Sequence, residues 1–230
     1  MNDFLSFFQN KVNNYCIITF FILRLFFLLA IGNDIPVSTD YEVRYRHLAE
    51  NIIYGEKYGV GADMVYPPLY PLFIAMNMLL FESHLLSIKV IQIIFDLVIC
   101  VLIYLIGISL WDRKVGLIAM NLWGVYPIAM WQTSLVATET LFTLLILLFL
   151  LSLINSYSRK SIKYASVSGV FLGLAMLTRP LLTYFPMIIP IIYWKKLSNM
   201  NRVIYFYFIM LMSFFVTLTP WAYLNYVNYN

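Results

Sequence analysis

Apolar residues gather in eight long runs separated by short polar breaks, and runs of this length predict helices. The runs cover residues 15–32, 66–81, 85–110, 115–131, 139–154, 164–178, 181–194 and 203–220. All of them except 66–81, about seven in total, are expected to cross a lipid bilayer. The pattern therefore predicts an all-α, polytopic integral membrane protein, with residues 1–230 forming a single membrane domain.

The run at 66–81 is the exception because little of it remains after its prolines. From Pro71 to Phe81 a helix reaches only about 16 Å, against a hydrocarbon core of about 30 Å. This segment is expected to lie in the outer membrane interface or to dip into it. The runs at 164–178 and 181–194 are also short, and they are expected to form a hairpin whose tip stops below the far surface.

Basic residues set the expected orientation. The three breaks at 112–114, 156–163 and 195–202 hold eight of the fifteen Lys and Arg residues but only one acid, Asp112. The positive-inside rule places these breaks in the cytoplasm. The N-terminus is then also cytoplasmic, and residues 33–84 form the first extracytoplasmic loop of a multi-pass protein of the cell (plasma) membrane.

Composition supports a membrane protein. The chain is 62% hydrophobic and only 11% charged, which is too much apolar surface for one soluble core. Because the basic residues of its +4 net charge lie mostly in the short breaks, no nucleic acid partner is expected. The outer loop gathers seven of the eleven acids, Asp34, Asp63 and Glu82 among them, so any chemistry is expected to face outward.

The outer loop is expected to contain two juxtamembrane helices. Thr39 and Glu42 have the spacing of a capping box, Gly55 is a natural helix stop, and apolar residues between them recur at helical spacing. A second helix is expected to begin after Pro67 and Pro68, because missing amide donors are tolerated in a first turn. Both helices should lie on the membrane surface.

Two charges fall deep inside predicted membrane spans. Arg24 lies in the first span and Asp96 in the next crossing segment, 85–110. Isolated charges at such depth are costly, so the two are expected to form a structural ion pair. The five tryptophans, Trp123 included, lie mostly near span ends and are expected to form an aromatic belt.

Six short motifs in order resemble a known superfamily. They are "DYE" at 40–42, "YPPLYPLFIA", "GLIAMNLWGVYPIAM", "TETLF", "GLAMLTRP" and "TPWAYLNY". Together they resemble the GT-C glycosyltransferases, which include the protein mannosyltransferases and the aminoarabinose transferases, and most closely the dolichyl-phosphate-mannose-protein mannosyltransferase-like branch. The family's His-Pro-Pro reads Tyr66-Pro67-Pro68 here. The chain is expected to correspond to the N-terminal half of a family member, with the C-terminal half missing from this sequence.

The resemblance implies a membrane enzyme. It would transfer a sugar, with inversion, from a polyprenyl-phosphate donor to a protein, lipid or glycan acceptor on the extracytoplasmic side. A non-catalytic membrane subunit or a fragment is the alternative. A transporter is less favoured, because the sequence shows no internal repeat and its acids gather outside the spans.

Three carboxylates are candidates for catalysis. The resemblance favours Asp40 as the base that deprotonates the acceptor, although an acid in a first helical turn is also stabilised by the helix dipole. Glu42 is explained equally by the capping box, and Glu139 either begins a helix or contributes to a site at the outer membrane surface. No metal ligand set is predicted, because two carboxylates alone do not specify a divalent metal, which stays an open possibility as cofactor.

The remaining candidates would bind the donor. Arg179, in "LTRP" at the tip of the short hairpin, is expected to bind the donor phosphate rather than only reach toward lipid headgroups. Arg44 and Arg46 are reserve phosphate ligands, and Tyr66 is a candidate by its place in the Tyr-Pro-Pro motif.

Overall fold

The computed structural model describes residues 2–32, 37–59, 66–81, 84–194 and 200–229. Regular structure in these ranges is entirely helical, which confirms the all-α prediction. The elements are α1 (Asn2–Gln9), α2 (Lys11–Phe27), η1 (Leu28–Gly32), η2 (Tyr41–Tyr45), α3 (Arg46–Tyr54), α4 (Leu69–Leu80), α5 (His84–Leu110), α6 (Arg113–Gly124), α7 (Pro127–Ser134), α8 (Glu139–Ser158), α9 (Ile162–Met176), η4 (Pro180–Leu182), α10 (Phe185–Trp194) and α11 (Met200–Tyr229).

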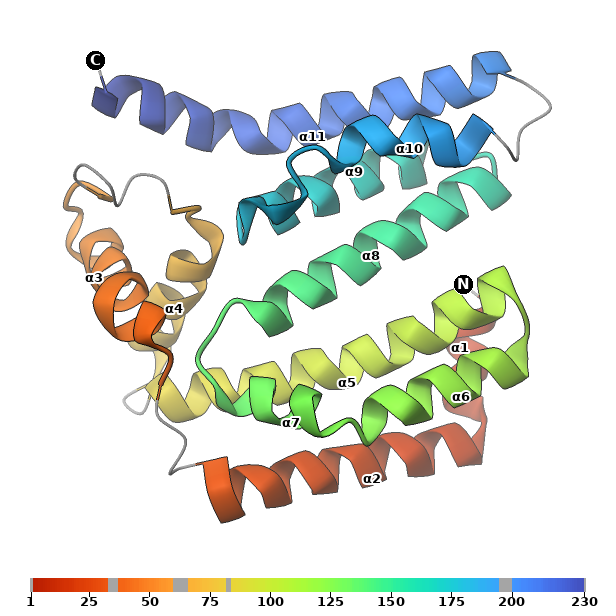
Figure 1. The fold of residues 1–230 in the computed structure, drawn as a ribbon, viewed down its shortest axis with the longest axis horizontal. Coiled ribbons are helices and arrows are strands. Elements are labelled where there is room, and N and C mark those ends of the chain that lie inside the picture. Colours follow the sequence, from red (N-terminus) through yellow and green to blue (C-terminus); the bar gives the residue numbers. More distant parts are fainter. Residues whose placement is uncertain (1, 33–36, 60–65, 82–83, 195–199, 230) are drawn as a thin grey trace.

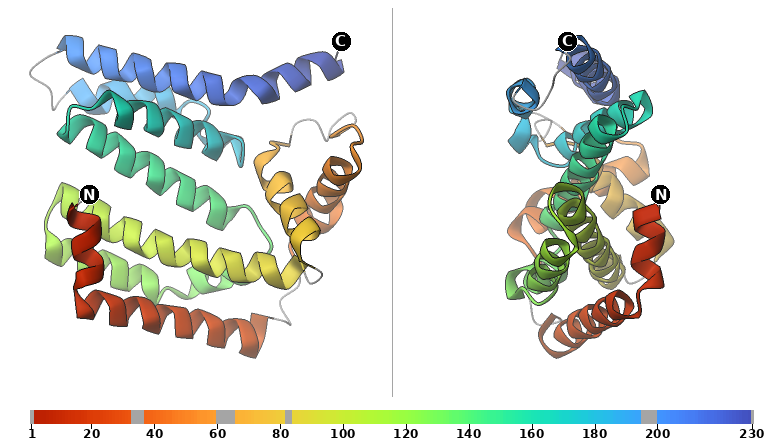
Figure 2. Two further views of the ribbon diagram at one scale, coloured as in Figure 1. Left: turned by 180° about the vertical axis from the view of Figure 1, so that it is seen from behind. Right: turned by 90° about the vertical axis from the view of Figure 1, so that its right-hand side faces the viewer.

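The longer helices run roughly side by side as one bundle, and α3 and α4 lie together at one of its ends (Figure 1). The connections α5–α6 and α8–α9 lie at the opposite end, where α1 also lies, as the view from behind shows (Figure 2). The basic breaks at 112–114 and 156–163 therefore share one end, as the expected topology requires. Most of the third break, residues 195–199, falls outside the described residues. Which end faces the cytoplasm stays a prediction.

The expected seven crossings are not confirmed. Within the described ranges, four helices are long and apolar enough to span a membrane: Lys11–Ala30, His84–Leu110, Glu139–Ser158 and Val203–Val227. The runs expected at 164–178 and 181–194 form the shorter helices α9, of 15 residues, and α10, of 10 residues.

The run at 115–131 is divided by a proline. Helix α6 ends at Gly124 and α7 begins at Pro127, with Tyr126 extended between them. Proline disfavours helical geometry in the residue before it and cannot donate a backbone hydrogen bond. One expected span is therefore two short helices.

Helix α4 does not run alongside the long helices but packs against α3 across the end of the bundle (Figure 2). This agrees with the prediction that 66–81 does not cross. The side chains that join α3 and α4 to the bundle form one apolar cluster. It includes Tyr41, Tyr45, Ala49, Tyr70, Ile74, Ile88, Val136 and Leu141.

The predicted capping box at Thr39 and Glu42 is wrong. The helix begins one residue earlier, because the Ser38 hydroxyl accepts a hydrogen bond from the Tyr41 backbone N–H at 3.2 Å. A π-helical turn follows, in which the Arg46 N–H donates to the Tyr41 carbonyl. Gly55 ends α3 with a left-handed φ of 69°, as expected of a helix stop.

The predicted pairing of Arg24 with Asp96 is confirmed. The two side chains form an ion pair with 0% and 2% of their surfaces exposed. The Trp123 indole N–H also donates to Asp96 Oδ1 at 2.9 Å, and Arg24 donates to the Gly124 carbonyl at 2.8 Å. Trp123 therefore has a structural contact in addition to its expected place in an aromatic belt. Together, Arg24, Asp96 and Trp123 join α2, α5 and α6.

Candidate functional site

Two hydrogen bonds fix the α3/α4 pair over the ends of the bundle helices. The Ser38 hydroxyl donates to the Val136 carbonyl at 2.7 Å, just before α8 begins. The Leu69 N–H donates to the Leu177 carbonyl at 2.9 Å, just after α9 ends. The outer-loop helices are thereby held beside the two positions where Glu139 and Arg179 stand.

Glu139 and Arg179 form an ion pair. Arg179 Nη1 lies 2.6 Å from Glu139 Oε1, and the two side chains are 37% and 36% exposed, with arginine first. Glu139 is the first residue of α8, and Arg179 lies between α9 and η4. The other carboxylate oxygen, Oε2, is buried and has no hydrogen-bond partner among the described residues. Two residues predicted separately are thus brought together by the fold.

A second ion pair lies on the outer-loop helix. Arg44 Nη1 stands 3.2 Å from Asp40 Oδ1, one turn away, and the Asp40 side chain is 62% exposed. The Arg44 guanidinium also lies over the Tyr66 ring, 4.7 Å from its centroid, as in a cation–π contact. Asp40, Arg44 and Tyr66, all predicted site residues, are therefore neighbours.

Tyr45 packs beside Tyr66, the ring that the Arg44 guanidinium covers. Its ring meets those of Tyr66 and Tyr70 edge to face, with centroids 6.3 Å and 5.2 Å away. Burial raises the pKa of Tyr45, the negative charge of Asp40 raises it further, Arg179 opposes this and Glu139 adds to it. The hydrogen bonds from Ser38 to Val136 and from Leu69 to Leu177 hold the elements that carry the two pairs at the same end of the bundle.

The Tyr45 and Tyr70 hydroxyls are neutral at physiological pH. Burial raises the pKa of Tyr70 well above its ordinary value, with the Glu139 charge as the next cause. Both phenols therefore keep their protons and remain hydrogen-bond donors. In the sequence, Tyr45 is only one of the apolar residues that recur at helical spacing between Thr39 and Gly55. Its position directly after Arg44, and five residues after Asp40, is the one signal that could have marked it.

Glu42 and Arg46 are not joined to this site by any contact in the described part of the chain. The Glu42 side chain is exposed. Arg46 pairs instead with Glu50, at 3.0 Å. Tyr41, which precedes Glu42, contacts the start of α5, where its hydroxyl lies 2.9 Å from His84 Nε2.

No cluster of three or more His, Cys, Asp or Glu side chains that could hold a metal occurs in the ranges the structure covers. Three outer acids of the predicted loop, Asp34, Asp63 and Glu82, lie outside those ranges. A divalent metal thus stays the open possibility that the sequence left, with no ligand cluster for it among the described residues.

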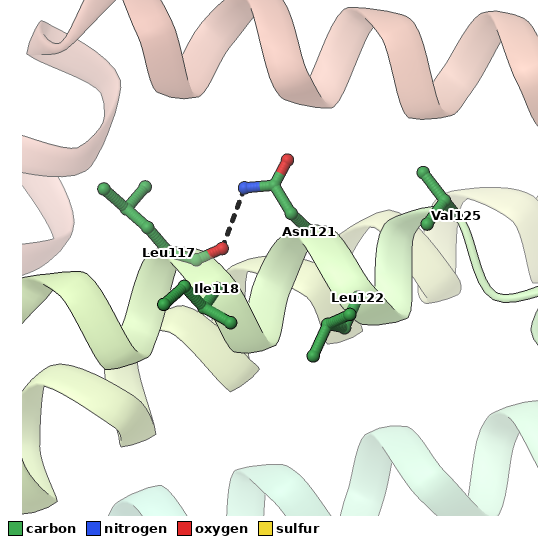
Figure 3. Close-up of a pocket in the computed structure, with 5 residues that line it drawn as sticks. All are labelled: Leu117, Ile118, Asn121, Leu122 and Val125. Atoms are coloured by element: carbon green, nitrogen blue, oxygen red, sulfur yellow. Dashed lines mark hydrogen bonds between the residues drawn. The ribbon is translucent and has the colours of Figure 1, made fainter.

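A depression along α6 is apolar. It is lined by Leu117, Ile118, Asn121 and Leu122 of this helix and by Val125 directly after it (Figure 3). The Asn121 amide donates to the Leu117 carbonyl of its own helix at 2.8 Å, so even its polar side chain is satisfied locally. This face has the character of a lipid-facing surface and offers no reactive group.

Comparison with known proteins gives one match. The family model described as dolichyl-phosphate-mannose-protein mannosyltransferase matches residues 65–223, which is more than half of the chain. The matched region includes Tyr66, Glu139 and Arg179, whereas Asp40 and Arg44 precede it. No curated protein and no solved structure matches. With an all-helical fold that carries apolar helices long enough to span a membrane, the chain belongs to this family of GT-C-type membrane glycosyltransferases.

Proposed function

We propose that this protein transfers a sugar, with inversion, from a polyprenyl-phosphate donor to a protein, lipid or glycan acceptor on the extracytoplasmic side of the plasma membrane. The observation that carries the proposal is that two carboxylate–guanidinium contacts, Asp40 with Arg44 and Glu139 with Arg179, lie at the end of the bundle where α3 and α4 pack. They lie at the end of the bundle opposite the basic breaks at 112–114 and 156–163.

Asp40 is the proposed base. Its carboxylate is largely exposed, so an acceptor hydroxyl can approach it, and only one of its oxygens contacts Arg44. The acceptor oxygen attacks the anomeric carbon while its proton passes to Asp40, and the bond from that carbon to the phosphate oxygen breaks. The electron pair stays on the phosphate, and attack from the opposite face inverts the anomeric centre.

Arg179 is the proposed ligand of the donor phosphate, with Arg44 as a second cation. Guanidinium groups match the geometry of phosphate oxygens and stabilise the charge that develops on a departing phosphate. The residues that follow Arg179 support a lipid-linked donor. Leu181 and Tyr184 are 72% and 75% exposed, which leaves apolar surface beside the guanidinium for contact with a lipid chain.

Two amide substitutions on one helix test the proposal. Membranes containing the wild type, Asp40→Asn or Glu42→Gln are supplied with a labelled polyprenyl-phosphate sugar, and product formation is measured. General-base catalysis contributes about 100- to 10,000-fold, so Asp40→Asn should lose at least about 100-fold of the rate, while Glu42→Gln should stay within about twofold. Full activity of Asp40→Asn would remove Asp40 as the base, and an inactive wild type would favour a non-catalytic subunit.

A further inference from the structure

The Glu139–Arg179 contact differs from the other exposed ion pairs of the described residues. Asp40–Arg44 and Arg46–Glu50 join neighbours one turn apart on a helix surface. Glu139 and Arg179 are 40 residues apart and meet only because the tertiary fold brings the start of α8 to the end of α9. Their contact, at 2.6 Å, is also the shortest of the three.

The contact occupies the cation that the proposed function assigns to the donor phosphate. Arg179 Nη1 is engaged by Glu139 Oε1, so a phosphate that binds there must compete with a carboxylate. The other carboxylate oxygen, Oε2, is buried with no hydrogen-bond partner among the described residues. No second hydrogen bond of the carboxylate within those residues therefore has to break when the guanidinium turns away.

We propose that Glu139 is a positioning residue that holds Arg179 in the ligand-free site, is displaced by the donor phosphate, and takes Arg179 back as polyprenyl phosphate leaves. This inference rests on the proposed function. It gives Glu139 a role that acts on Arg179 rather than on the sugar.

Charge explains why such a competitor is useful. The donor is a phosphodiester with one negative charge, whereas the product is a phosphomonoester that carries between one and two at neutral pH. A free guanidinium would therefore hold the product more tightly than the donor. A carboxylate that binds the same guanidinium lowers the apparent affinity for every phosphate, because only the fraction of the protein in which Arg179 is unpaired can bind one.

Binding of a fluorescent short-chain polyprenyl phosphate to the purified protein in nanodiscs tests the inference. Removing a competitor of the strength of a half-exposed ion pair should make Glu139→Gln bind the probe about fivefold more tightly. The matched control is Glu50→Gln, since Glu50 is similarly exposed at 38% and also pairs with an arginine, Arg46. Its affinity should equal that of the wild type, and Arg179→Gln should bind far more weakly.

An unchanged or weaker affinity of Glu139→Gln would overturn the inference. If that variant does not fold, Glu139→Asp provides the same test, because a carboxylate one methylene shorter should compete less and give an intermediate gain. The two proposals fail differently. If the wild type binds the probe and transfers sugar, but Glu139→Gln binds the probe no more tightly, only the role of Glu139 is refuted. If the wild type neither binds the probe nor transfers sugar, both the proposed function and this inference are refuted.

Discussion

Breaking the buried ion pair between Arg24 and Asp96 should strongly destabilise the protein. Both side chains are almost fully enclosed, at 0% and 2% exposure, so neither charge can turn to water when its partner is removed. Loss of one member of such a pair typically lowers the free energy of unfolding by about 3–5 kcal/mol. For a chain of this size that corresponds to roughly 10 °C in melting temperature.

The structure also ranks the related variants. Asp96→Asn and Arg24→Gln should be similarly harmful, whereas the double variant should recover part of the loss because no buried charge remains unpaired. Trp123→Phe removes one hydrogen bond to a charged acceptor and should lower stability by about 2 kcal/mol. Arg46→Gln breaks only an exposed pair and should change stability by less than about 1 kcal/mol.

Thermal unfolding in detergent, followed by tryptophan fluorescence, measures all of these variants; Trp123→Phe also needs size-exclusion chromatography after heating, because it removes a reporter. The double variant should lose less stability than the sum of the losses of the two single variants. An Asp96→Asn variant that is destabilised while Arg24→Gln is not, or a double variant whose loss equals that sum, would refute the pairing.

Substitutions at three further sites, Gly169, Gly55 and Ser38, test a helix contact, a turn and a helix cap. Gly169→Ala places a methyl group against the Met210 carbonyl oxygen, so α9 and α11 must separate and stability should fall by about 2 kcal/mol. Ser166→Ala on the same helix removes only a hydrogen bond to Ser213 and should lose less than about 1 kcal/mol in the same melting assay. Gly55→Ala should lose about 1 kcal/mol because its φ is positive, and Gly55→Asn should retain most of the stability; equal losses for both would contradict the left-handed turn. Ser38→Ala removes a helix cap and the bond to the bundle, so it should expose the outer-loop helices to faster amide exchange, and unchanged exchange would show that the cap is not needed.

The sequence was sufficient for the features that the bilayer dictates. Short apolar length predicted that 66–81 does not cross, and basic residues predicted which breaks share an end. Arg24 could be paired with Asp96 because few other charges lie deep in predicted spans, so each had few alternative partners. These inferences rest on costs that hold for any membrane protein, independent of how the helices pack.

Features set by local competition or by tertiary contact were harder to predict. Pro127 could have predicted the break between α6 and α7, but the whole run is apolar and was therefore predicted as one helix. The helix cap is Ser38 rather than the predicted Thr39, because the Ser38 hydroxyl also bonds to the bundle. Glu139 and Arg179 were chosen separately, since nothing in their 40-residue separation reveals that they touch. Tyr45 was not predicted as a site residue, because the recurrence of apolar residues at helical spacing already accounts for a tyrosine at that position.

The central claim is that the end of the bundle carrying α3 and α4 faces outward, and side-specific labelling tests it most directly. Lys57 follows α3 and Lys160 follows α8, at opposite ends of the bundle, and both side chains are exposed. With Lys57→Cys or Lys160→Cys in intact cells, a membrane-impermeant maleimide should label position 57 and should reach position 160 only after the membrane is opened. Labelling of position 160, but not of 57, from outside intact cells would contradict the orientation and the proposed extracytoplasmic transfer.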